Sequence, residues 1–136
     1  MANEAVIIEL LGPQKGCPVN YAIADATAVP KGTLMAVDDG RTAIKTGGEA
    51  GENMFCGIAA HEKVANDGST TISCWTHGIF DIYDSEGFLV GVRTCIIGAN
   101  NIDKVANADM LHATVGIALA TNLGGVKQPV LIGSGL

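Results

Sequence analysis

Four cysteines and three histidines are the residues of this chain best suited to act as nucleophiles, general bases or metal ligands. Structural zinc sites usually place two ligands within a few residues of each other, and no CxxC pair occurs here. A nucleophilic Cys–His pair needs only contact in space, and Cys56 with His61 or Cys74 with His77 are the candidates. Residues three apart on a strand point to opposite faces, which disfavours the second pair. The full set is Cys17, Cys56, Cys74, Cys95, His61, His77 and His112.

Three of the cysteines lie inside apolar, strand-like stretches, which predicts buried and reduced thiols. Acidic residues such as Asp84 and Glu86 fall mainly in turns, where a solvated position explains them. Asp81 alternates with apolar neighbours, and we interpret it as an outward-facing strand residue. The sequence contains neither an EF-hand loop nor a GxxxxGK[ST] phosphate loop. We therefore predict no enzymatic activity, no metal and no cofactor.

The composition of the chain indicates what kind of fold positions the cysteines, histidines and acidic residues. The 136 residues are 48% hydrophobic and 16% charged, which is enough apolar material for the core of one domain. Aromatic residues make up only 4% and glycine occurs 18 times, which favours short strands and many tight turns. A net charge of −6 argues against a nucleic-acid partner. No apolar run approaches the roughly 20 residues of a membrane helix, and no signal-peptide pattern is present, so we expect no membrane partner and synthesis in a cytoplasm.

Residues 1–20 are predicted to form an N-terminal arm and linker, and residues 21–136 a single β-rich domain. The arm carries a short apolar run, and a stretch rich in glycine and proline follows from Gly12 to Pro18. Such a strand either forms an edge of its own sheet or adds to the sheet of a partner. The run consists of Ala5, Val6, Ile7, Ile8, Glu9, Leu10 and Leu11.

The rest of the chain alternates between strand and turn signals. An Asp-Gly step at residues 39–40 lies between two apolar runs and predicts a hairpin over residues 32–45. The apolar spacing between Asn100 and Ala113 predicts one short helix. Further strands are predicted over residues 54–60, 70–77, 79–83, 88–97, 114–121 and 128–132, with a bulge or bend at Gly78. The predicted fold class is mainly β, a compact barrel or sandwich-like domain with at most one or two short helices.

Four segments, in this order, carry a resemblance to a known family. They are AVPKGTLM from Ala28, FCGIAAHEKVANDGSTTI from Phe55, WTHGIFDI from Trp75 and VGIALA from Val115. In their order and spacing these segments resemble the head decoration, or capsid cement, proteins of tailed viruses such as bacteriophages. The resemblance spans most of the chain, although each segment is short.

The resemblance implies a β-tulip-like domain that forms a homotrimer on the outer capsid surface of the virion and stabilises the lattice of the major capsid protein. Such a protein is assembled in the host cytoplasm and is structural rather than catalytic. The resemblance also implies that the arm, Ala5 to Leu11, adds a strand to the capsid protein. We name Trp75, Phe80 and Tyr83 as candidate contacts on the surface or in the trimer.

Two other functions are compatible with the residues alone. A small-ligand or glycan-binding β module of the adhesin type would use Trp75, Asp81 and Tyr83 as its platform. A small hydrolase would use one of the Cys–His pairs named above. We rank the decoration protein first, the binding module second and the hydrolase third.

Overall fold

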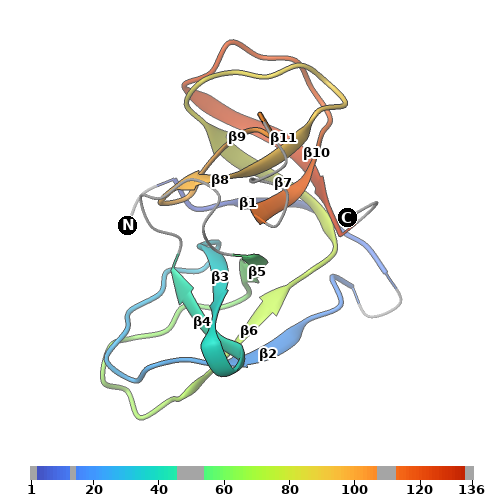
Figure 1. Cartoon of the computed structure of the whole chain (residues 1–136). Coiled ribbons are helices and arrows are strands. Elements are labelled where there is room, and N and C mark those ends of the chain that lie inside the picture. Colours follow the sequence, from blue (N-terminus) through green and yellow to red (C-terminus); the bar gives the residue numbers. More distant parts are fainter. Residues whose placement is uncertain (1–2, 13–14, 46–53, 107–112, 134–136) are drawn as a thin grey trace.

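The computed structural model describes residues 3–12, 15–45, 54–106 and 113–133. These residues form two small β-barrels that lie one above the other, with the N-terminal strand running along their boundary (Figure 1). The prediction of a mainly β fold is confirmed. Within the described residues, no helix has the length and apolar character needed to cross a membrane.

The first barrel is built from the C-terminal half of the chain. Its strands are ordered β7-β11-β10-β8-β9, and β9 returns to β7 through a parallel pairing of Ile102 with Asp84. β1 (Val6–Leu10) is attached to the opposite end of the same β7 edge. The barrel strands are β7 (Gly78–Asp84), β8 (Arg93–Gly98), β9 (Asn101–Lys104), β10 (Thr114–Ala118) and β11 (Val126–Ile132).

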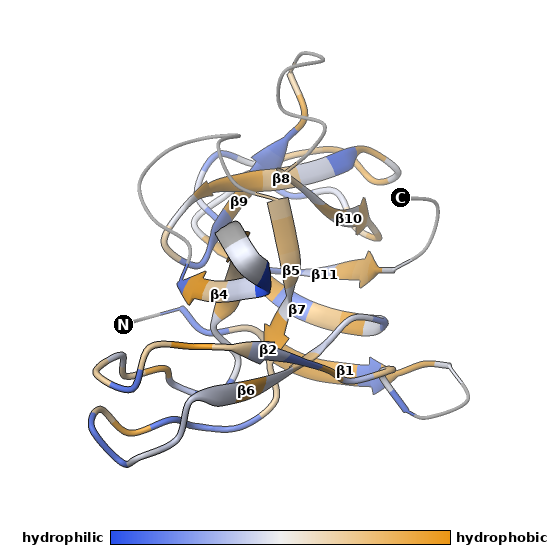
Figure 2. Cartoon of the chain, turned by 60° about the horizontal axis from the view of Figure 1, so that its bottom comes forward, coloured by the Kyte–Doolittle hydropathy of each residue, from blue (hydrophilic) through white to orange (hydrophobic). Residues whose placement is uncertain are grey.

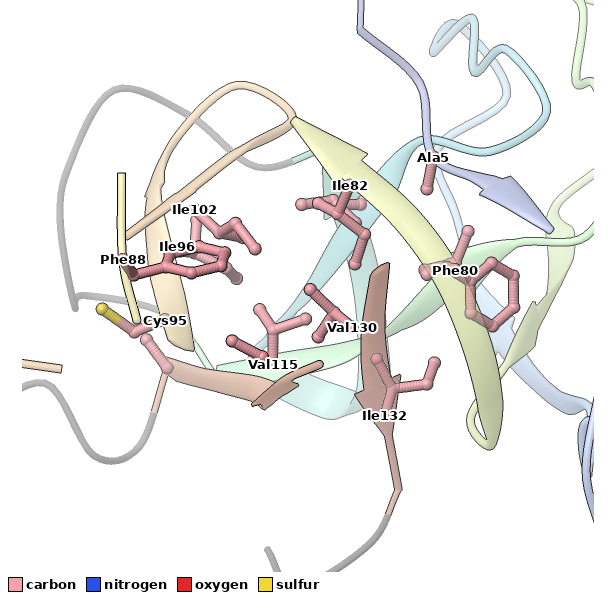
Figure 3. Packing of buried hydrophobic residues seen from close by; sticks show 14 residues of the cluster. Ala5, Phe80, Ile82, Phe88, Cys95, Ile96, Ile102, Val115, Val130 and Ile132 are labelled. Atoms are coloured by element: carbon pink, nitrogen blue, oxygen red, sulfur yellow. The ribbon is translucent and has the colours of Figure 1, made fainter. Parts of the chain in front are cut away.

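Strict alternation in β7 and β11 builds the core of this barrel. Every second residue of β7 is buried, including Phe80 and Ile82, because successive side chains of a strand point to opposite faces. Figure 3 shows the buried side chains turned inward, with Ile82, Val115 and Val130 near the middle of the barrel. The buried core is aliphatic apart from Phe80, Phe88 and Cys95, in keeping with the low aromatic content.

The second barrel comes from the N-terminal half and closes in the order β2-β4-β3-β5-β6. Its own core is a smaller buried cluster that includes Met35, Ile72 and Cys74. Its elements are β2 (Val19–Ala22), β3 (Leu34–Asp38), a 3-10 turn η1 (Asp39–Arg41), β4 (Thr42–Lys45), β5 (Met54–Ala59) and β6 (Thr71–Trp75).

β5 of the second barrel contributes side chains to both cores. A bulge at Cys56 shifts the register of β5 against β3, and the adjacent Gly57 has a φ of 146°. Phe55 and Ile58 therefore pack with the core of the first barrel, while Cys56 and Ala59 pack with that of the second. β3 also contributes to both cores, because Leu34 packs with the first core and Met35 with the second, so the two cores adjoin along β3 and β5.

The predicted hairpin over residues 32–45 is confirmed as β3 and β4. Gly40 turns the chain with φ 69° and ψ 25°, a left-handed conformation that glycine adopts without steric cost. The predicted bend at Gly78 separates β6 of the second barrel from β7 of the first. Here a β-carbon would lie 2.6 Å from the carbonyl oxygen of Glu9, so glycine lets β1 approach.

The predicted helix between Asn100 and Ala113 is wrong where the structure describes that segment. Residues 101–104 form β9, which pairs with β8 as a tight hairpin. Asn100 occupies the turn with φ 52°, and its side chain accepts a hydrogen bond of 2.8 Å from the amide of Leu34. The Asn-Asn step is thus a turn signal and not a helix cap. Residues 107–112, including His112, lie outside the described residues.

Two smaller expectations also need correction. The division at residue 20 does not match the fold, because β2 spans it and belongs to the second barrel. The Asp84 carboxylate is fully buried, not solvated. Its Oδ1 accepts hydrogen bonds from the amides of Glu86 (3.0 Å) and Gly87 (2.8 Å), which fixes the predicted turn after β7.

Candidate functional site

The predicted arm lies along β7 as an edge strand of the chain's own sheet. This is the first of the two arrangements considered for it, the other being addition to the sheet of a partner. Val6 pairs with Asp81 and Ile7 with Phe80 in an antiparallel ladder. After a bulge at Ile8, the ladder resumes with Glu9 opposite Ile79. Among the described residues, no strand pairs with the other side of β1. Its outer backbone groups are therefore available to an added strand.

The side chains of β1 divide between the body and the surface. Ile7 and Leu10 pack against the core of the first barrel. Val6 and Ile8 are 49% and 50% exposed, although both are large and apolar. Figure 2 shows β1 as a mostly hydrophobic strand with a hydrophilic stretch near its end. An open edge that also presents apolar side chains is a surface suited to binding another protein.

Backbone hydrogen bonds hold β1 at both ends. The amide of Ala5 donates to the carbonyl of Gly32 at 2.7 Å, where a β-carbon on Gly32 would collide with Ala5. At the other end, the amide of Leu11 donates to the carbonyl of His77 at 3.4 Å. The segment is therefore a fixed part of the body within this chain, in contrast to a freely extended arm.

A pocket of about 300 Å³ opens beside β1, with Trp75 as its aromatic wall. The Trp75 ring packs against Phe80, with ring centroids 5.8 Å apart, and Lys31 Nζ lies 5.6 Å from the centre of the Trp75 ring. Lys31 brings a positive charge to this surface of an acidic chain. The pocket is lined by Ala5, Val6, Ile7, Lys31, Gly32 and Trp75.

The remaining predicted contacts do not gather at this pocket. Phe80 is fully buried in the barrel core, which corrects its assignment as a surface contact. Asp81 and Tyr83 alternate with Phe80 and Ile82 and are half-buried on the outward face of β7. Because Trp75 packs against Phe80 on the inner face, Trp75, Asp81 and Tyr83 do not form one platform.

A second apolar surface, which we call the apolar tip, lies at the far end of the first barrel. It consists of Leu89, Val90, Leu119 and Leu123, of which Leu123 is 96% exposed. Two adjacent loops carry these residues. They are joined by hydrogen bonds from the amide of Asn122 to the carbonyl of Phe88 (3.0 Å) and from the amide of Val90 to Thr121 Oγ1 (3.0 Å). Sequence reasoning missed this surface, because single apolar residues in loops carry no periodic signal.

Among the described residues, the thiols and imidazoles do not form the candidate nucleophilic pairs considered above. His61 contacts the backbone of Glu62 and Ser73, and Cys74 is fully buried. Cys17 and His77 instead flank Gly12, where a β-carbon would lie 2.6 Å from Sγ and 3.2 Å from Nδ1. All four cysteines are unpaired, and all but the half-buried Cys17 are buried. The described residues contain no group of three or more side chains placed to hold a metal ion.

Burial raises the pKa of the Cys95 thiol to about 11, with the nearby Asp103 carboxylate as a second cause. A hydrogen bond to the Cys74 thiol raises the pKa of Cys56 well above its ordinary value, and burial adds to this effect. Both thiols are therefore held in their protonated, weakly nucleophilic form at neutral pH.

One buried cation was not anticipated from the sequence. Lys63 is 2% exposed, and its ammonium donates to the carbonyls of Asp25 (2.7 Å) and Val64 (3.2 Å) and to Asp67 Oδ1 (3.2 Å). The pKa of Asp67 is lowered by a hydrogen bond from the Ser69 amide and by Lys63. Through these contacts Lys63 joins its own loop to the loop that carries Asp25.

Comparison with known proteins adds no assignment. No family model matches the chain. No curated protein matches its sequence either.

Proposed function

We propose that this chain is a capsid decoration protein that binds the outer surface of an icosahedral viral head and stabilises the lattice of the major capsid protein. The observation that carries the proposal is the outer edge of β1, which no strand of the described residues pairs and which presents Val6 and Ile8 to solvent. Because four segments resemble tailed-virus decoration proteins, we propose the major capsid protein as the partner of this surface. The acidic net charge supports a location on the outside of the shell, away from the genome.

The proposed contact is the addition of an extended capsid segment to β1. Main-chain hydrogen bonds would supply affinity, and alternate side chains of the added strand would enter the Trp75 pocket. Because β1 is already paired with β7, the capsid protein binds a strand that is held in place before contact. A preformed edge costs less ordering entropy on binding than a free arm.

We further propose that the chain acts as a homotrimer whose subunits meet at the apolar tip. The tip offers exposed aliphatic side chains without an open strand edge, which suits packing around a symmetry axis. The β1 edge lies at the opposite side of β7 from the tip loops, so self-contact leaves it free. Three β1 edges on one particle would then raise avidity without any new kind of contact.

Cosedimentation with expanded, undecorated shells of tailed viruses tests the capsid contact. We expect the chain to pellet with the shells, and Val6→Glu together with Ile8→Glu to weaken binding at least about tenfold, since both place charge in the contact. Val64→Glu is the matched control, because Val64 is 60% exposed on a loop of the other barrel. Thermal unfolding of each variant checks that the fold is retained.

Equal binding by the double variant and by Val64→Glu would move the contact away from β1, and no pelleting with any shell would reject the decoration function. Point substitutions are preferable to deletion of residues 1–11. Deletion would uncover the β7 edge and remove Ile7 and Leu10 from the core, so a loss of binding could reflect unfolding.

The ligand-binding module is less well supported. The Trp75 pocket has the size of a small-molecule site, but Asp81 and Tyr83 do not contribute to its lining. Val6 and Ile7 of β1 instead form part of its wall, which ties the pocket to the same surface as the proposed capsid contact.

A further inference from the structure

The second barrel holds two buried thiols on neighbouring strands. Cys56 of β5 and Cys74 of β6 are 5% and 0% exposed and belong to the same buried cluster. Ala59, which lies opposite Cys74 in the register, belongs to that cluster as well. The bulge at Cys56 turns its side chain to the side of Ala59, so both cysteines face one small core.

The strands approach closely at this point. A β-carbon on Gly57 would lie 2.8 Å from the β-carbon of Cys74, so the backbone next to Cys56 touches the Cys74 side chain. Cys74 is also the largest cause of the raised pKa of the Cys56 thiol, and burial is the second. Neither other cysteine shares this cluster, because Cys95 lies in the first barrel with Sγ 3.9 Å from the carbonyl of Lys104, and Cys17 lies beside His77.

We propose that Cys56 and Cys74 are a dithiol that a small disulfide oxidant, such as oxidised glutathione, converts into a cross-strand disulfide. One cysteine thiolate attacks the oxidant and forms a mixed disulfide, which releases the first reduced glutathione. The second cysteine thiolate attacks the protein sulfur of that mixed disulfide and releases the second reduced glutathione. Two protein thiols are oxidised and one glutathione disulfide is reduced, and the two protons pass to the departing thiolates.

The product would close the chain between β5 and β6 into a ring and remove conformational freedom from the unfolded state. If the disulfide raises the folding equilibrium constant by some factor, then by linkage folding raises the equilibrium constant for forming the disulfide by the same factor. The inference rests on the second barrel alone and is independent of the proposed function at β1.

The test uses a Cys17→Ser chain, which leaves three buried thiols. The chain is equilibrated in glutathione buffers of graded oxidised-to-reduced ratio, with and without denaturing urea, and is then quenched for thiol counting and peptide mapping. We expect two thiols to be lost together and the mapped disulfide to join Cys56 to Cys74. The folded chain should oxidise at a ratio at least about tenfold lower than the chain in urea.

Cys95→Ala in the same background should behave identically, whereas Cys74→Ala should lose the paired oxidation. The proposal would be overturned if the folded chain kept all three thiols. It would also be overturned if half of the chain were oxidised at the same ratio of oxidised to reduced glutathione with and without urea. Cys95→Ala leaves both Cys56 and Cys74 in place. Its peptide map therefore tests the disulfide even if Cys74→Ala does not fold.

Discussion

Trp75 is the residue at which the separate parts of the molecule meet. Its ring packs on Phe80 of the first barrel, and Lys31 of the second barrel lies over it. Gly16 lies so close that a β-carbon would be 2.6 Å from the ring. One part of the ring of this single tryptophan therefore packs inside, while another part lines a pocket.

Cys95 makes stability depend on pH in the alkaline range. Its pKa in the folded chain is raised to about 11, above the ordinary value of 9.0, so the unfolded chain releases this proton first. The stabilisation is complete below about pH 9 and is lost as pH rises toward 11. We expect the free energy of unfolding to fall over this window, by at most about 1.4 kcal/mol per pH unit for one thiol.

Urea unfolding of Cys95→Ala across that pH window checks this prediction. The variant should show a shallower decline than the parent chain. Val115→Ala, a truncation in the same core without a thiol, should lower stability at every pH and keep the parent slope. Equal slopes for the parent chain and Cys95→Ala would contradict the assignment.

At the scale of elements, Lys63 joins two loops that no ladder connects beyond one isolated bridge between Val29 and Lys63. Replacing Lys63 with Met keeps the apolar stem and removes the ammonium, which leaves the carbonyls of Asp25 and Val64 without this donor. We expect a loss of about 2–4 kcal/mol in the free energy of unfolding, measured by urea titration.

Lys127→Met is the matched control, since Lys127 is exposed on β11. It should change stability by no more than about 0.5 kcal/mol. If the two variants are equally stable, the buried ammonium contributes nothing and the loops are held by their backbone contacts alone.

The strand pattern could be predicted well where alternation was strong. In β7, buried and half-buried residues alternate along the whole strand, and Asp-Gly identified the turn between β3 and β4. The pattern failed at β9, because Ile102 is a single buried residue between polar ones and the turn at Asn100 resembles a helix cap. A four-residue strand has too few alternations to outweigh helical spacing.

The candidate site was only partly predictable for a related reason. The run from Ala5 to Leu11 marks β1, but its burial depends on pairing with β7, which is far away in sequence. Lys31 and Gly32 join the Trp75 pocket through the same long-range contact. A sequence shows which segments are apolar, whereas the choice between self-pairing and partner-pairing is made by tertiary contacts.

At the scale of the whole molecule, the apolar tip predicts self-association. Placing a charge there by Leu123→Asp should weaken the trimer at least about tenfold, because the charge would be desolvated on packing. Light scattering over a concentration series measures the change. Loss of the trimer should also weaken shell binding through lost avidity, although β1 is unaltered.

Val64→Asp serves as the control, as it adds the same charge at an exposed apolar residue outside the tip. A parent chain that is monomeric throughout the series would refute the proposed trimer. A trimer that survives Leu123→Asp would place its interface elsewhere.

The chain path has a consequence for the order of folding. The polypeptide passes through β1, completes the whole second barrel, and only then returns to β7, which pairs with β1. During synthesis the second barrel can therefore close while β1 still waits for its partner strand. Until β7 emerges from the ribosome, Ile7 and Leu10 stay uncovered, which makes this early stage the one most exposed to misassociation.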